Sequence, residues 1–337
     1  MNEHAAYADL KKVELHCHLE LAFRPSTLKH WALQAGLQVE SDADFARHFL
    51  IREPMSDLPT VLRKFLDVRD LLASEEMLEQ LAFEVCEDMH VHHGVRVLEL
   101  RYAPSFLLDK HTHLNADRLQ AAILRGCARA EALYPLATGL ICILQRTHTA
   151  EENARWLDFA LTHRDGFVGV DLADNEVDCE PEPFIPLFQR AKASGFGITI
   201  HAGEPAVPGI SRNIITAIEG MGADRIGHGV QAIHDPEAIR LLADRGIPLE
   251  LCPTSNRLTQ AVPSLDEYPL LKLRDAGVKV TVNTDDPGIM DTNLSREYAL
   301  MVEHLGVTRA DLEQFNAWAQ AASFIDHEKI ERAMAAD

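Results

Sequence analysis

Short runs of apolar and β-branched residues recur along the chain, and longer stretches with helical spacing separate them. The apolar runs span residues 13–18, 95–102, 137–145, 167–173, 197–202, 225–228, 247–252 and 279–284. Helical spacing is found over 74–90, 116–133, 151–163, 183–193, 210–220, 236–245 and 264–275. Alternating strands and helices predict a parallel sheet, and eight such units favour an α/β fold closed into a (β/α)₈ TIM barrel. An open doubly wound sheet is disfavoured because no Gly-rich phosphate loop follows the first strand.

The connection after the first strand is unusually long. It covers about residues 20–93, more than one crossover helix needs, and it carries an apolar stripe that includes Leu58, Leu62 and Phe65. A helical insertion beside the mouth of a barrel is a candidate lid. The alternative is that the stripe packs against the core, as helical stripes usually do. No linker or low-complexity tract divides residues 1–337, so we expect a single barrel domain.

The net charge, the cysteines and the lengths of the apolar runs limit the classes of partner and the cell compartment that we expect. The net charge of −20 argues against nucleic acid, whose binding draws on Lys and Arg, and it suits a small neutral or metal-directed substrate better. Six cysteines at irregular positions indicate free thiols in a reducing compartment. No apolar run approaches membrane-spanning length and the N-terminus lacks a secretory pattern, so we expect a cytoplasmic protein that has no membrane partner.

Two histidines, His16 and His18, lie within the first apolar run. Alternate residues of a strand point to the same face, so the two imidazoles face one point. Each buried imidazole needs a partner for its polar atoms. The pair by itself fits either a metal site or a satisfied core position, because a metal site needs three or four ligands.

Further polar residues stand where three other apolar runs end. They are His201 with Glu204, His228, and the pair Asp285 and Asp286. Imidazole nitrogen and carboxylate oxygen suit zinc, and three histidines with one aspartate leave a position for water. Each residue alone could be a cap, a loop histidine or a solvated turn. Together with His16 and His18 they stand at the carboxyl ends of strands one, five, six and eight, the rim where barrel active sites are built.

Seven ordered motifs, each ending an apolar run, resemble those of the adenosine deaminase family of the amidohydrolase superfamily over nearly the whole chain. The motifs occupy residues 14–19, 98–102, 169–173, 201–204, 226–229, 252–256 and 284–287. With this resemblance, His16, His18, His201 and Asp285 are expected to bind one zinc ion, which would lower the pKa of water to about 7. Binuclear amidohydrolases carry a bridging lysine at the end of strand four. This chain has none there, so we expect one metal per chain.

The resemblance also implies roles for the acidic residues and for His228. Glu204 would place a proton on N1 of an aminopurine and later move one to the departing ammonia. His228 would orient or deprotonate the water and help to stabilise the developing alkoxide. Asp286 would hydrogen-bond N7, which requires a protonated carboxyl because N7 has only a lone pair. The insertion would cover the purine.

The chain departs from the family pattern on the sugar side. Glu20 stands where the family has the aspartate that meets the ribose 5′-hydroxyl, and Asp174 replaces the glycine whose amide meets purine N3. Phe23 and Arg24 follow, so an apolar 5′ extension ending in a carboxylate would fit this side of the site. The alternative is that Phe23 packs under the lid while Arg24 points to solvent.

The leading functional interpretation is zinc-dependent deamination of adenosine or deoxyadenosine to inosine or deoxyinosine and ammonia. A second enzyme interpretation is deamination of free adenine or of a 5′-modified nucleoside such as 6-aminodeoxyfutalosine. The alternative outside enzymology is a catalytically silent, purine-binding barrel. The presence of every candidate ligand and acid weakens that alternative. In each case the partner is a small purine, and the sequence predicts no oligomeric state.

Overall fold

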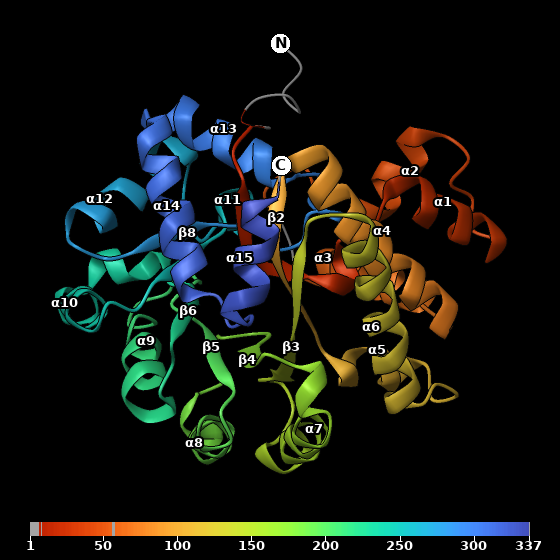
Figure 1. Ribbon diagram of the computed structural model, residues 1–337, viewed down its shortest axis with the longest axis horizontal. Coiled ribbons are helices and arrows are strands. Elements are labelled where there is room, and N and C mark those ends of the chain that lie inside the picture. Colours follow the sequence, from red (N-terminus) through yellow and green to blue (C-terminus); the bar gives the residue numbers. More distant parts are fainter. Residues whose placement is uncertain (1–6, 8, 56–57, 337) are drawn as a thin grey trace.

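The computed structural model describes residues 7, 9–55 and 58–336, with the backbone alone for 58–62. Eight strands form one parallel sheet in which each strand pairs with the next along the chain. The strands are β1 (Lys12–His18), β2 (Val95–Tyr102), β3 (Ala137–Gln145), β4 (Gly169–Ala173), β5 (Gly197–Ala202), β6 (Arg225–His228), β7 (Leu249–Leu251) and β8 (Val280–Val282). Every predicted strand is confirmed, and helices surround the sheet (Figure 1).

The barrel closes between its first and last strands through the backbone just after β8. The amide of Asp285 donates to the carbonyl of His16 at 2.8 Å, and the amide of His18 donates to the carbonyl of Asp285 at 2.8 Å. These two bonds flank an isolated parallel bridge between Cys17 and Asp285. The eighth unit is thus joined to the first at the carboxyl rim, and the predicted (β/α)₈ barrel is confirmed.

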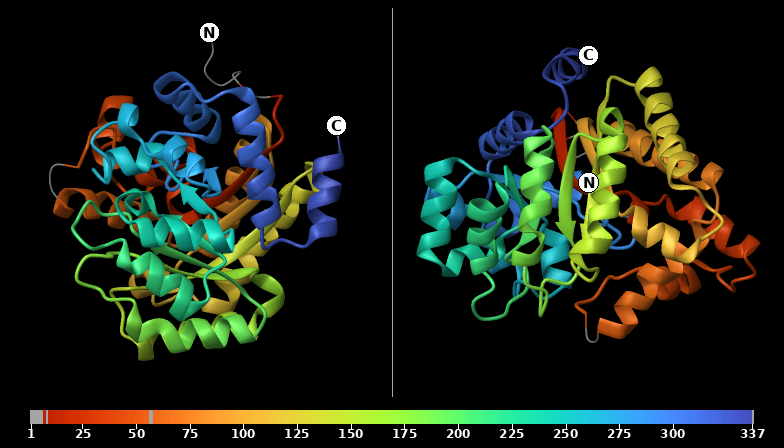
Figure 2. Two further views of the ribbon diagram at one scale, coloured as in Figure 1. Left: turned by 90° about the vertical axis from the view of Figure 1, so that its left-hand side faces the viewer. Right: turned by 90° about the horizontal axis from the view of Figure 1, so that it is seen from below.

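Helices follow the strands around the sheet, and Figure 2 shows them from two sides. After the strands they are α4 (Glu75–His93), α5 (Pro104–Lys110), α6 (Ala116–Leu133), α7 (Ala150–Thr162), α8 (Ile185–Ala193), α9 (Arg212–Thr216), α10 (Pro236–Arg245), α11 (Pro253–Leu258) and α12 (Leu270–Asp275). The predicted continuous helix over 264–275 is wrong. A single turn over Leu265–Glu267 is separated from α12 by Tyr268 and Pro269, since proline cannot continue a helix from a preceding turn.

The insertion after β1 is helical, as predicted. It contains α1 (Pro25–Gln34), α2 (Asp42–Phe49) and α3 (Leu58–Leu71), which lie together at one side of the barrel (Figure 1). The side chains of Leu58 and Leu62 lie outside the described residues, whereas Phe65 is half-buried and packs against the main core. The role of this insertion as a lid stays a prediction.

Three helices follow β8, a region for which the sequence pattern predicts no element. They are α13 (Leu294–Leu305), α14 (Arg309–Ala322) and α15 (His327–Ala335). The turn between α14 and α15 places Phe324 against the amino ends of the strands, where side chains on Gly169 and Gly197 would collide with its ring. We call the end of the barrel that contains the amino ends of the strands the floor, and the opposite end, with the carboxyl ends, the rim. No helix in the described part of the chain is long and apolar enough to cross a membrane.

Candidate metal centre and active site

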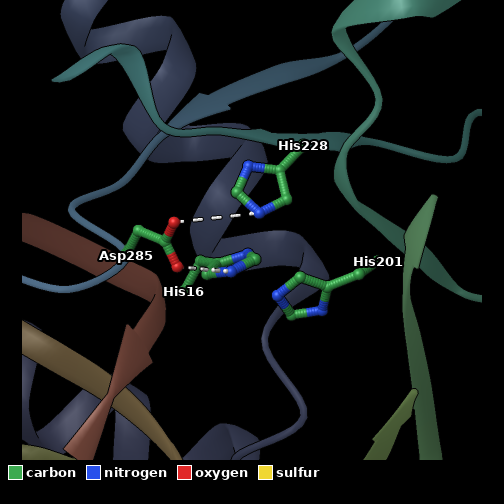
Figure 3. A group of neighbouring side chains, drawn as sticks. All are labelled: His16, His201, His228 and Asp285. Atoms are coloured by element: carbon green, nitrogen blue, oxygen red, sulfur yellow. Dashed lines mark ion pairs between the residues drawn. The ribbon is translucent and has the colours of Figure 1, made fainter. Parts of the chain in front are cut away.

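Four side chains from different strands converge at the rim of the barrel (Figure 3). One potential ligand atom from each of His16, His201, His228 and Asp285 lies within 4.8 Å of the others. His16 comes from β1, His201 from β5 and His228 from the end of β6, while Asp285 follows β8. The barrel therefore brings together residues that the sequence separates by up to 269 positions.

His18 joins this group through two of its members. Its Nε2 lies 3.3 Å from Asp285 Oδ1 and 3.3 Å from Nε2 of His201, and His16 Nε2 lies 3.2 Å from the same Oδ1. Ligands of a tetrahedral zinc ion, at about 2.0–2.1 Å from the metal, lie about 3.3 Å from one another. His228 lies farther from the aspartate than His16 and His18 do, since its Nε2 is 3.8 Å from Oδ2, the other oxygen of Asp285.

The backbone is strained at two of these positions. His228 has φ 59° and Asp285 has φ 65°, values that side-chain-bearing residues seldom adopt. Such conformations persist where the surrounding structure fixes them, and they cluster at functional sites. Here the bonds of Asp285 to β1 hold the backbone, and its carboxylate points toward the imidazoles (Figure 3).

Carboxylates behind two of the histidines determine which ring nitrogen faces the centre. Nδ1 of His16 lies 2.8 Å from Glu250 Oε2, and Nδ1 of His201 lies 3.0 Å from Asp171 Oδ2. A carboxylate accepts hydrogen bonds, so each Nδ1 carries the proton and each Nε2 presents a lone pair. Among the described residues, the buried Nε2 of His16 has no hydrogen-bond partner. This donor set fits a divalent metal such as zinc.

One arginine holds both of these carboxylates. Arg101 is fully buried and donates to Asp171 and to Glu250, each at 2.8 Å. Burial would raise the pKa of Asp171, but the charges of His201 and Arg101 outweigh it and hold that pKa below its ordinary value. Burial also lowers the pKa of His201 to about 3, which keeps the imidazole neutral for metal binding.

Sequence reasoning assigned no role to these supporting residues. Arg101 and Asp171 belong to the family motifs at 98–102 and 169–173, and Glu250 interrupts the apolar run 247–252. A charged residue inside a run that otherwise predicts a buried strand needs a buried partner, and this was the available signal.

Glu204 lies beside the cluster in the turn after β5. The carboxylate of Glu176 accepts from the amides of Gly203 and Glu204, at 2.6 and 3.0 Å, and so fixes this turn. Glu204 Oε1 accepts from the Thr259 hydroxyl at 3.0 Å, and Oε2 lies 3.7 Å from Nε2 of His228. The predicted acid thus stands next to the predicted water-orienting imidazole.

Two buried carboxyl groups extend the site from the metal cluster. Asp286 Oδ1 has no hydrogen-bond partner in the described structure. The pKa of Asp286 is raised well above its ordinary value, mainly by burial and secondly by the negative charge of Asp285. Glu20 Oε1 accepts from the Ala103 amide at 2.7 Å, and burial raises the pKa of Glu20 to about 7. The charge of Glu20 also raises the pKa of Asp286, so the two groups interact.

Asp174 adopts a backbone conformation typical of glycine. Its φ is 87°, and its carboxylate accepts from the hydroxyl of Thr147, from Gln145 Nε2 at 3.3 Å and from the amide of Asn175 at 2.7 Å. Aspartate tolerates this region better than most residues because its side chain can hydrogen-bond locally. The local backbone geometry therefore does not require glycine here.

Arg24 is engaged by acidic residues of α4. Its guanidinium lies 2.7 Å from Glu87, 2.6 Å from Asp88 and 3.6 Å from Glu84. Phe23 is buried and meets the ring of Phe45 edge-on. The positive charge of Arg24 is thus already paired with three carboxylates. This geometry does not favour the predicted role of Arg24 in binding a substrate carboxylate.

Comparisons with known proteins agree with the geometry. A family model described as adenosine deaminase matches residues 11–335. An adenosine deaminase from Plasmodium falciparum is 35% identical over 324 residues, which cover 94% of this chain and 86% of that protein. An amidohydrolase from Burkholderia ambifaria, solved with bound zinc, has a TM-score of 0.88 and 30% identity, covering 100% of this chain and 92% of its own. The N6-methyl-AMP deaminase from Arabidopsis thaliana has a TM-score of 0.82 and 27% identity, covering 97% and 96%.

Proposed function

The chain belongs to the adenosine deaminase family, and on this premise we propose that it hydrolyses adenosine or 2′-deoxyadenosine to inosine or deoxyinosine and ammonia. Membership of this family makes it a purine-deaminating aminohydrolase, and the identity of the nucleoside is the proposal. The observation that carries the proposed deamination is a cluster of side chains at one point on the rim. His16, His18, His201 and Asp285 converge there, and Glu204 lies beside them.

We assign these four residues as the ligands of one zinc ion. The separations of 3.2 and 3.3 Å between their atoms support this assignment, as do the carboxylates behind His16 and His201. When bound, the ion supplies a nucleophile at neutral pH by lowering the pKa of water to about 7.

Glu204 is the proton donor and acceptor of the reaction. Addition of water at C6 of the purine breaks the ring aromaticity, so a proton must reach N1 as C6 becomes tetrahedral. Protonated Glu204 provides this proton. Its carboxylate then takes one proton from the added water and gives it to the leaving amine. As ammonia departs and C6 becomes a carbonyl, the carboxylate takes the second water proton, so Glu204 ends the reaction protonated, as it began.

Two further groups orient the purine. Asp286 donates a hydrogen bond to N7, and its raised pKa supports the protonated form that this contact requires. The amide of Asp174 is assigned to N3, and its glycine-like conformation supports this role. The insertion carrying Leu58, Leu62 and Phe65 is assigned as the cover over the ring.

Glu20 favours a nucleoside over a nucleotide. A buried carboxyl at the 5′ side accepts a hydrogen bond from a hydroxyl, but when ionised it repels a phosphate. One of its oxygens accepts from the Ala103 amide, which holds the carboxyl in place. The pairing of Arg24 with α4 leaves that arginine without a free charge to offset the repulsion.

The test is loss of the aminopurine absorbance with adenine, adenosine, deoxyadenosine, AMP and 6-aminodeoxyfutalosine. We expect kcat/KM to be highest for adenosine and deoxyadenosine and lowest for AMP. Glu20→Gln should narrow the gap between adenosine and AMP, because it removes the negative charge and keeps the size of the side chain. Preference for any of the other three compounds would overturn the nucleoside assignment.

A further inference from the structure

We propose that Asn256 is a positioning residue that determines where His228 and Glu204 carry their protons. This inference rests on the proposed function, since it concerns the same reaction. Asn256 is fully buried on α11, the helix that follows β7. Its Nδ2 lies 3.0 Å from Nδ1 of His228 and 3.2 Å from Oε1 of Glu204.

The orientation of the Asn256 amide is fixed from both ends. Oε1 of Glu204 accepts from the Thr259 hydroxyl as well as from the amide, so the amide nitrogen and not the amide oxygen faces this acceptor. On the other end, the Tyr268 hydroxyl donates to Asn256 Oδ1 at 2.7 Å, and Tyr268 is itself buried. Reversing the amide would place two oxygens together at Glu204 and remove the bond from Tyr268.

This orientation selects one tautomer of His228. Because the amide donates to Nδ1, that nitrogen holds the lone pair and the proton lies on Nε2. His16 and His201 have the opposite arrangement, since carboxylates accept from their Nδ1 atoms. His228 therefore presents a donor to the centre. This explains how it can stand within the cluster without being a metal ligand.

The tautomer also distinguishes between the two roles expected for His228. A neutral imidazole with its proton on Nε2 cannot take a proton from water at that atom. It donates instead, and it is placed to stabilise negative charge that develops on the oxygen at C6. Asn256 thus makes His228 a stabilising donor and leaves the proton transfers to Glu204.

Asn256 acts on Glu204 in the same way. Glu204 Oε1 already accepts from Asn256 and from the hydroxyl of Thr259, at 3.2 and 3.0 Å. Because both donors engage Oε1, the proton of the acid form lies on Oε2, the oxygen that faces His228. One amide therefore directs both the acid proton and the imidazole proton toward the reacting carbon.

The test is Asn256→Asp, which keeps the shape of the side chain and replaces the donor by an acceptor. In ¹⁵N-histidine-labelled protein, the ring nitrogen shifts of His228 should report a proton on Nε2 in the wild type and on Nδ1 in the variant. We expect kcat for adenosine to fall by about 10²-fold, the usual effect of removing one transition-state donor, with little change in KM. Zinc content should stay at the wild-type value.

Asn316 offers a matched control far from the site. It is also buried, its Oδ1 accepts from the Tyr298 hydroxyl at 2.9 Å, and its Nδ2 donates to the carbonyl of Leu312. Asn316→Asp should lower thermal stability without moving the His228 shifts or kcat. If Asn256→Asp fails to fold, Tyr268→Phe releases the amide and Tyr298→Phe is its control.

The inference is overturned if His228 keeps its proton on Nε2 in Asn256→Asp, or if kcat there matches that of Asn316→Asp. It is equally overturned if Tyr268→Phe and Tyr298→Phe reduce kcat alike. Failure of the proposed function has a different result. Wild-type protein would then deaminate none of the five purines, while the nitrogen shifts would still report whether Asn256 sets the tautomer.

Discussion

The rim and the floor of this barrel both bury charged side chains, but they treat them differently. At the floor, Arg225 donates to Glu250 at 2.5 Å, to Glu99 at 2.6 Å and to the carbonyl of Ala322 at 2.9 Å, so each of its nitrogens has a partner. At the rim, by contrast, the described part of the chain offers no hydrogen-bond partner to His16 Nε2 or to Asp286 Oδ1.

In this comparison the fully bonded arginine is structural, whereas the two unbonded atoms belong to the assigned site. A buried polar atom without a partner costs about 1–3 kcal/mol, and a fold retains that cost where a ligand will satisfy the atom. Glu250 belongs to both regions, since one oxygen accepts from Arg225 and the other from His16. The floor therefore stabilises the residues that hold the rim ready for a metal and a substrate.

The largest expected effect comes from removing the carboxylate at the centre of the rim. Asp285→Ala should abolish zinc binding and reduce kcat/KM by about 10³-fold or more, because several kcal/mol of transition-state stabilisation leave with the ion. Metal analysis and a deaminase assay measure both. The matched change at the opposite end is Asp224→Ala, which breaks an ion pair with Lys192 and should keep metal and activity. Equal loss in the two variants would break the comparison.

The next largest effect is expected for Glu204→Gln, which tests acid catalysis separately from metal binding. Glu204→Gln preserves the size of the side chain and removes the acid, so kcat should fall by about 10²-fold or more. Zinc content should stay at one per chain, because Glu204 is not among the assigned ligands. Wild-type turnover in this variant would exclude Glu204 as the N1 acid, and two zinc ions per active chain would exclude the mononuclear site.

The rim was more predictable from sequence than the floor. His16 and His18 are conspicuous because histidines at alternate positions of an apolar run have few structural uses. The carboxyl ends of barrel strands share one rim, and this predicts that His201, His228 and Asp285 lie there with them. The eight strands followed from local patterns for the same reason, as each apolar run carries its own signal.

The floor depends on contacts that no local pattern encodes. Glu99 and Arg225 pair across 126 positions, and Phe324 packs against Gly169 and Gly197 of two earlier strands. The partners of Arg24 were not predictable for the same reason, since they lie on α4, more than 60 residues along the chain. Periodicity identifies an element and its face but does not name the partner on a distant element.

Crowding the floor should reduce stability and leave the chemistry unchanged. A Cβ atom added at Gly197 would lie 2.2 Å from the ring of Phe324, so Gly197→Ala should lower the free energy of unfolding by about 1–3 kcal/mol. Urea unfolding measures this, and Phe324→Leu should relieve part of it in the double variant. Loss of zinc at unchanged stability would show that the floor acts on the rim directly.

The smallest expected effect is a pH dependence of stability at the floor. Lys12 is buried, its Nζ donates to the carbonyls of Tyr7, Leu10 and His93, and burial lowers its pKa from 10.5 to about 8. Above about pH 8 the folded state releases this proton while the unfolded state keeps it until about pH 10.5. Stability rises with pH wherever the unfolded state binds more protons, so Lys12 should add about 1 kcal/mol between pH 8 and pH 9.

Urea unfolding of wild type and Lys12→Met at both pH values isolates this contribution, because methionine keeps an unbranched side chain and has no proton to lose. The difference in free energy of unfolding between the two proteins should change by about 1 kcal/mol from pH 8 to pH 9. Zinc content should be the same in both proteins. An unchanged difference would mean that carbonyl oxygens alone satisfy the ammonium, without the cost that burial imposes on an unpaired charge. Lys12 has no carboxylate partner within hydrogen-bond distance among the described residues, and burial brings its pKa into this pH range. The guanidinium of Arg225 stays charged throughout the range and is paired with Glu99 and Glu250, so the charge of Lys12 and not that of Arg225 should respond to pH.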